Sequence, residues 1–168
     1  VLGWWFTFGP NGGQAWFDRA GRAACTVSRA PAPTLPPQTV WFEDNTPSGA
    51  VKTGTWLWES GQYASGSKSH TDGAKAGEHD HAFTNATTGM TVAAGEKLVT
   101  WVMISPCNPP RQIMLEWHDG TWEHRAYWGE DLMPRGTAGT VSRVAMGPLP
   151  AAGQWVRLVV PAAAVGLE

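Results

Sequence analysis

The sequence lacks the features that mark several large classes of protein. It has no stretch of 18 apolar residues, so we expect no transmembrane helix. Its 12 Lys and Arg residues are scattered over a chain with a formal net charge of -2, which leaves no basic patch for nucleic acid. No segment has the periodicity of a long amphipathic helix. These absences predict no membrane span, no nucleic-acid partner and no helical fold.

Catalytic motifs are also missing. The chain contains no nucleophile elbow, no metalloprotease motif and no Cys-His signature. Glu116 and Glu123 flank a turn, and paired carboxylates about 5 to 10 Å apart are what glycoside hydrolysis requires. Glu123 beside Arg125, however, is more typical of a cross-strand ion pair on a sheet surface. We therefore expect no catalytic residues and no enzymatic activity.

The most informative pattern that is present runs from Met114 to Gly129. Apolar and polar residues alternate on both sides of Asp119-Gly120, a dipeptide typical of β-hairpin turns. The alternation places Leu115 and Trp117 on one face and charged residues on the other. This pattern predicts antiparallel β structure near the centre of the fold.

The rest of the composition favours one all-β domain, an antiparallel β-sandwich. The 20 Gly and 13 Pro in 168 residues are typical of many short strands separated by turns. The sequence allows a short helical turn at Ala162–Val165, and it predicts central strands at 98–104 and 154–160. The expected strands are 3–8, 14–18, 40–43, 55–59, 79–83, 90–92, 97–104, 112–118, 121–127 and 155–160.

Four strings carry a resemblance to a known type of domain. They are W-F-E-D-N-T-P-S-G-A from Trp41, S-H-T-D-G-A-K-A-G-E-H-D-H-A-F from Ser69, W-E-H-R-A-Y-W-G from Trp122 and G-P-L-P-A-A-G-Q-W-V-R-L from Gly147. Together they make most of the segment 40–168 similar to a bacterial extracellular β-sandwich module of jelly-roll or concanavalin A-like type. The resemblance implies a sandwich fold and a secreted or cell-surface location, and it implies no activity.

The order of segments differs from that of the modules it resembles. In them, the segment equivalent to Val165–Glu168 is followed by one more hairpin that closes the sandwich. Residues 1–22 resemble this hairpin placed at the opposite end, so the chain resembles a circularly permuted module. The hairpin could close its own sandwich, insert into a neighbouring copy, or belong to one period of a tandem array. Its candidate assembly residues are Trp4, Trp5, Phe6, Phe8, Trp16 and Phe17.

A Pro-rich linker, residues 23–39, joins this hairpin to the sandwich domain at 40–168. If extended at about 3.1 Å per residue, the linker spans roughly 50 Å, which reaches across one domain or to the next. Cys25 in the linker and Cys107 in a turn are predicted to form a disulfide, within or between chains, worth about 2 to 4 kcal/mol. The alternative is two unrelated thiols. The chain starts at Val1 without a signal peptide, as a mature or excised secreted product would.

The histidines are the candidate metal ligands. His79 and His81 share one face of a strand, and His70 could join them across a loop with Asp72 or Asp80. The alternative is that these imidazoles tie loop backbone to the strand. A structural calcium ion has loop candidates, although none follows the EF-hand pattern. These candidates are Asp44, Asp72, Asp119 and Asp131.

The 11 Trp residues are the remaining functional clue. Indole rings either fill the core or present a flat surface on which a sugar ring stacks. Trp56 and Trp58 share a face and are predicted to be core. If a sugar site exists, its predicted residues are Trp122, Glu123, His124, Arg125, Tyr127 and Trp128.

Two functions follow as hypotheses. The first is a non-enzymatic structural or assembly module that associates with copies of itself or polymerises by strand exchange, as the displaced hairpin indicates. The alternative is a carbohydrate-binding-like module with a polysaccharide partner, as the Trp content indicates. We favour the first because it accounts for the order of segments, whereas binding accounts only for composition.

Overall fold

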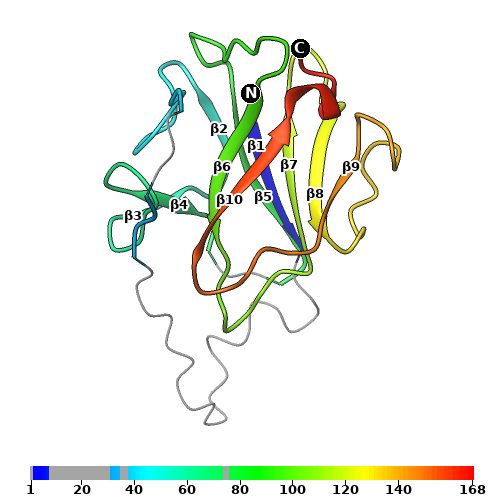
Figure 1. Ribbon diagram of the computed structural model, residues 1–168. Helices are drawn as coiled ribbons and strands as arrows, with labels where there is room; N and C mark the ends of the chain where they lie inside the picture. The colour runs from blue at the N-terminus through cyan, green and yellow to red at the C-terminus, as the bar shows by residue number, and fades with distance from the viewer. Residues whose placement is uncertain (1, 8–30, 35–37, 74–75) are drawn as a thin grey trace.

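The computed structural model describes residues 2–7, 31–34, 38–73 and 76–168, the first of these as backbone only. These residues form short β-strands and one 3-10 turn, and they contain no α-helix (Figure 1). The strands are β1 (Leu2–Thr7), β2 (Val51–Gly54), β3 (Leu57–Glu59), β4 (Ser69–Thr71), β5 (Glu78–Thr84), β6 (Lys97–Met103), β7 (Gln112–Trp117), β8 (His124–Gly129), β9 (Val144–Gly147) and β10 (Trp155–Pro161). The 3-10 turn is η2 (Ala162–Val165), at the position where the sequence allows one.

The main layer is a six-stranded sheet in the order β2-β5-β1-β7-β8-β9. All neighbours are antiparallel except β8 and β9, which run parallel. The N-terminal strand β1 lies between β5 and β7 of its own chain, with Trp4 opposite His81 on one side and Leu115 on the other. The second strand expected for this hairpin, 14–18, lies outside the described residues.

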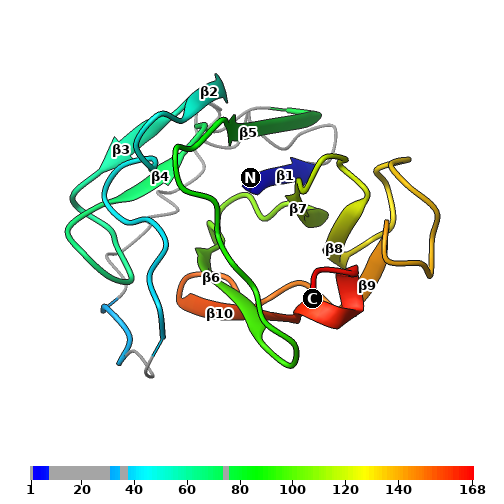
Figure 2. The same cartoon turned by 90° about the horizontal axis from the view of Figure 1, so that it is seen from above.

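Two smaller sheets complete the architecture. The antiparallel pair β6–β10 lies across from β1, β7 and β8, and the pair β3–β4 lies at one side (Figure 2). The expected all-β antiparallel sandwich is therefore confirmed. The expected strands 98–104 and 154–160 correspond to β6 and β10, each within one residue at both ends, but they form a two-stranded layer rather than the centre of the large sheet.

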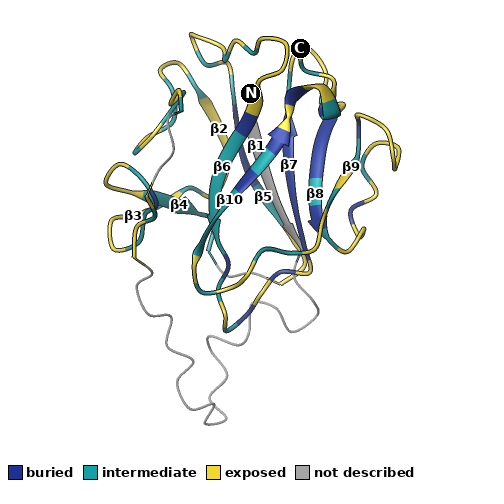
Figure 3. Ribbon diagram, viewed as in Figure 1, coloured by how far each residue is buried: buried dark blue, intermediate teal, exposed yellow. Residues whose placement is uncertain are grey.

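The core lies between the large sheet and β6–β10. Every residue of β7 is buried (Figure 3). Its apolar face, with Leu115 and Trp117, packs in the core with Leu158 of β10. Its opposite face carries Glu116, whose carboxylate accepts a hydrogen bond from buried Arg125 of β8. A buried ion pair of this kind is tolerated because each charge has its partner.

Several short strands differ from the expectations. The segments 40–43 and 90–92 are not strands, and the expected strand 55–59 is only the three residues of β3. The predicted hairpin exists as β7–β8, but its connection spans 118–123 instead of the two residues Asp119-Gly120. Its conformation is held by Asp119, whose carboxylate accepts hydrogen bonds from the Thr121 backbone and from His124.

Candidate functional site

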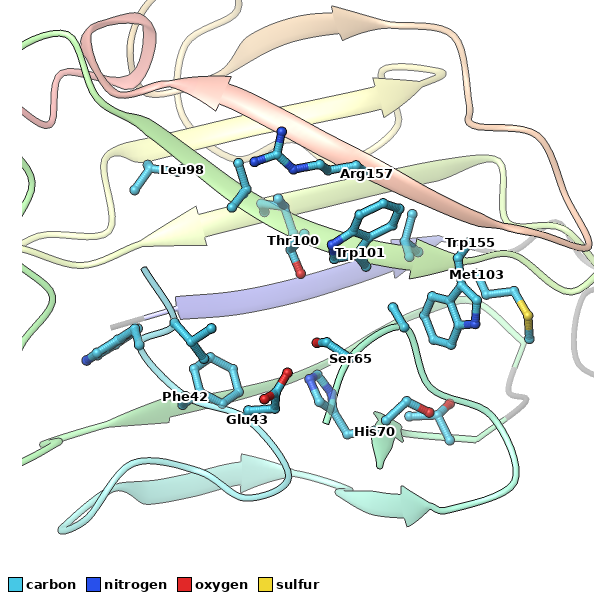
Figure 4. Close-up of a pocket in the computed structure, with 18 of the residues that line it drawn as sticks. Phe42, Glu43, Ser65, His70, Leu98, Thr100, Trp101, Met103, Trp155 and Arg157 are labelled. Carbon is cyan, nitrogen blue, oxygen red and sulfur yellow. The ribbon is translucent and has the colours of Figure 1, made fainter. Parts of the chain in front are cut away.

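A cavity of about 1230 Å³ opens between the β6–β10 pair, the β3–β4 pair and the segment 38–44. Its volume is above the roughly 300 to 1,000 Å³ of pockets for drug-sized ligands, so it has room for several linked rings. Figure 4 shows Phe42, Glu43 and His70 across the cavity from Trp101 and Trp155. This cavity is the candidate site.

The β6–β10 wall presents a row of large side chains because of strand register. Trp101 lies opposite Arg157 and Met103 lies opposite Trp155 in the antiparallel ladder, so these four share one face. All four line the cavity, and neither Trp101 nor Trp155 belongs to the hydrophobic core. The lining also includes Leu98, Thr100 and Val102, so the cavity reaches both faces of β6. Leu158 follows Arg157 on β10, so its side chain points to the other face, where it packs in the core.

Three polar atoms on this wall lack a partner. The indole nitrogens of Trp101 and Trp155 and the Nε of Arg157 are buried and form no hydrogen bond within the described part of the chain. Leaving a buried donor without an acceptor costs about 1 to 3 kcal/mol, and native proteins contain few such groups. Indole and guanidinium groups can only donate hydrogen bonds. The wall is therefore suited to a ligand that accepts hydrogen bonds.

The opposite wall is a cluster of aromatic rings. Trp56 and Trp58 stack with ring centroids 5.9 Å apart, and the His70 ring lies 5.4 Å from Trp58 and 6.2 Å from Phe42. Trp58 and Phe42 line the cavity, whereas Trp56 packs against the core. The expectation that both indoles of the 56/58 pair are core is thus correct for Trp56 only.

The segment that carries Phe42 is anchored by Asp44. The Asp44 carboxylate accepts hydrogen bonds from the backbone of Ser67 at 2.8 Å and of Lys68 at 2.7 Å, which lowers its pKa. Gly66 allows this close approach, because a Cβ there would lie 2.6 Å from Asp44 Oδ1. Asp44 therefore fixes one wall of the cavity instead of serving as a free ion ligand.

The candidate metal histidines form two separate pairs. His70 Nδ1 lies 2.8 Å from His81 Nε2, a hydrogen bond between two imidazoles. His79 pairs instead with Asp72, a residue that is 3% exposed. Burial, and secondarily His81, lowers the pKa of His70 to about 3, which keeps its ring neutral.

The metal prediction is therefore not supported by the described residues, where no three His, Cys, Asp or Glu side chains are placed to hold an ion. The physical reason is that each imidazole is already directed at a protein partner. The same holds for two of the other calcium candidates, since Asp119 bonds to His124 and Asp131 lies 3.6 Å from Arg143.

The residues predicted for a sugar site on the β8 hairpin are not brought together. Trp128 and His124 are buried on the core side, and His124 Nδ1 lies 2.6 Å from the carbonyl oxygen of Val165. Arg125 is buried on the other face, where it also contacts Glu123 at 3.2 Å. The remaining two, Trp122 and Tyr127, are half-buried and do not line the cavity.

Comparison with known proteins finds no matching family model, curated protein or solved structure. Within the described residues, no helix has the length and apolar character needed to cross a membrane. The candidate site is therefore interpreted from its own geometry.

The predicted assembly residues and disulfide lie mostly beyond what the structure describes. Trp4, Trp5 and Phe6 belong to β1, of which only the backbone is described, and Phe8, Trp16 and Phe17 lie outside the described residues. Cys107 is not a free thiol, but Cys25 also lies outside, so their pairing stays a prediction.

Sequence reasoning missed the cavity wall formed by Trp101, Trp155 and Arg157. One signal was present: each strand carries Trp among β-branched residues, and β10 adds a charged residue in the apolar run W-V-R-L-V-V. Burying a charged Arg side chain in a strand that is covered on both faces is energetically unfavourable. Arg157 therefore indicates that one face of β10 serves another purpose than the core.

Proposed function

We propose that this chain is a non-enzymatic carbohydrate-binding module that takes its ligand in the cavity beside β6–β10. The observation that carries the proposal is the wall of Trp101, Trp155 and Arg157, with its buried donors that lack acceptors. A sugar supplies both parts of what this wall needs. Its C-H faces stack on indole rings, and its oxygen atoms accept hydrogen bonds.

The two walls complement each other for such a ligand. Trp58 and Phe42 offer further ring faces across the cavity, while Glu43 and Ser65 offer acceptor and hydroxyl groups (Figure 4). Mixed aromatic and polar lining of this kind is typical of pockets that hold small organic ligands. The paired carboxylates considered for hydrolysis do not support catalysis, because Glu116 is buried in its ion pair with Arg125.

The assembly function receives less support. The displaced hairpin suggested donation of a strand pair to a neighbour, but β1 is paired on both sides within its own chain. This pairing supports closure of the chain's own sheet over donation of the strand to a neighbour. We propose a secreted or cell-surface location, supported by the Lys-poor composition and by Cys107, which is not free. The partner proposed for Cys107 is Cys25.

The first prediction tests the cavity. Calorimetric titration of the protein with a panel of soluble oligosaccharides should identify a binding member, and Trp155→Ala should weaken its binding by at least about tenfold, as loss of a central Trp does. Trp122→Ala is the matched control, because Trp122 is half-buried beside His118 and away from the cavity. Absence of binding to any panel member, or equal loss in both variants, would contradict the proposed function.

A further inference from the structure

We propose that the carbohydrate bound here is acidic, and that Arg157, with Trp101 and Trp155, binds its anionic group. This inference rests on the proposed function and names the class of sugar. The group recognised is a carboxylate, as in a uronic acid, or a sulfate ester, which presents the same acceptor oxygens. A neutral sugar would satisfy the indoles but would leave the guanidinium without a countercharge.

The placement of the three donors is set by the β6–β10 register. Trp101 and Arg157 are directly opposite, so their Cβ atoms are about 5 Å apart. Trp155 is two residues before Arg157 on the same strand, about 7 Å away along the chain. All three side chains leave the same face of the pair and line the cavity. One anionic group with several oxygens can therefore reach more than one of these donors.

The charge of Arg157 is not balanced by the protein. No hydrogen bond or ion pair joins the Arg157 side chain to a residue in the described ranges. The residue is half-buried, and its Nε is fully buried. Removing a charged group from water is unfavourable unless a partner of opposite charge takes the place of water. Arg111, by contrast, is exposed and pairs with Glu130. The arginine in the cavity thus differs from a surface arginine in lacking a carboxylate.

The acidic residues of the lining do not fulfil this role. Asp44 accepts hydrogen bonds from the 67–68 backbone, Asp72 pairs with His79, and Glu96 accepts one from the Ala93 backbone. Glu43 lies on the opposite wall (Figure 4), and Glu59, the last residue of β3, is an exposed side chain of the lining. An acidic sugar would place its anionic group at β10 and its hydroxyls toward Glu43.

The decisive experiment compares each acid with its neutral ester. Calorimetry is run on the full chain with oligomers of galacturonate, glucuronate and mannuronate, each beside its methyl ester, and with sulfated and neutral oligosaccharides. We expect at least one anionic oligosaccharide to bind about tenfold or more tightly than its uncharged counterpart. The uncharged compound cannot form the charge-assisted hydrogen bonds that the anionic group forms with Arg157. The sulfated members show which anionic group is preferred.

Arg157→Met keeps the aliphatic stem and removes the charge, so it should abolish the difference between acid and ester. Arg111→Met, outside the cavity, should leave the difference unchanged. If Arg157→Met does not fold, the acid and ester comparison on the unaltered protein still decides. Equal binding of acid and ester would overturn this inference while leaving the proposed function intact. No binding of any oligosaccharide, neutral or acidic, would overturn both.

Discussion

At the scale of single residues, buried polar groups in this protein fall into two kinds. Arg125 is fully engaged, with Glu116, Glu123 and the carbonyl oxygen of Ser142 as acceptors. The side chain of Arg157, which is half-buried with a buried Nε, has no acceptor among the described residues. Both are arginines on strands, but Arg125 lies opposite Glu116 whereas Arg157 lies opposite Trp101, so the contrast lies in their surroundings. The first arrangement stabilises the fold, whereas the second leaves recognition capacity for a ligand.

The imidazole pair at the cavity predicts a pH dependence of stability. Burial lowers the pKa of His70 from its ordinary 6.5 to about 3 in the folded chain, so between these pH values the unfolded chain binds one more proton than the folded chain. The contribution of His70 to the free energy of unfolding is therefore fully present above pH 6.5. It is lost as the pH drops from 6.5 toward 3, by at most about 1.4 kcal/mol per pH unit. His70→Gln should flatten this slope.

Urea unfolding at pH 7.5, 6, 5 and 4 measures the slope. Gln cannot titrate but can still hydrogen-bond to His81, so the variant should lose less stability than the unaltered protein on acidification. His118→Gln is the control, because His118 lies just after β7 and outside the pair. Parallel slopes for the His70 variant and the unaltered protein would show that the pair does not control acid stability.

At the scale of elements, the short strand β2 positions the aromatic wall. It pairs with β5 and leads directly into Trp56 and Trp58. Gly54 closes this pairing with a φ of 73°, and a Cβ there would lie 2.3 Å from the carbonyl oxygen of Asp80. Gly54 therefore meets two constraints, a left-handed backbone conformation and a close approach to the neighbouring strand.

Gly54→Ala should destabilise the protein by roughly 2 to 4 kcal/mol, because backbone strain and the clash with β5 add. Gly77→Ala should cost only about 1 kcal/mol, since Gly77 shares the positive φ, 84°, but has open space around its Cα. Thermal and urea unfolding of both variants measures the difference. Similar losses in the two would show that the approach to Asp80 is relaxed easily.

The same elements show what the sequence could predict. The β7–β8 hairpin, β5, β6 and β10 were predictable because alternation within one strand is a local property. The strands β2, β4 and β9 have three or four residues each, too few for a pattern to emerge. The cavity wall was not predictable because it depends on which residue of β6 faces Arg157, and this register is fixed by pairing between distant segments.

At the scale of the whole molecule, the two ends of the described chain depend on different layers of the sandwich. The N-terminal strand β1 is third in the six-stranded sheet, whereas β10 and η2 at the C-terminal end cover the core from the other layer. A central strand contributes two ladders of backbone hydrogen bonds, one to β5 and one to β7. Its removal would create two unpaired edges inside the sheet, which are sites for aggregation.

Deletion of residues 1–22 should therefore abolish cooperative folding or produce large aggregates. The full chain, by contrast, should be a monomer near 18.1 kDa by light scattering at all concentrations. If Cys25 and Cys107 pair within one chain, reductant should leave that mass unchanged and lower the thermal midpoint, because the bridge restricts the unfolded chain. A concentration-dependent ladder of larger species from the full chain would instead indicate that the N-terminal strand is donated to a neighbour. A truncated chain that stayed monomeric and equally heat-stable would show that β1 is not needed to complete the sheet.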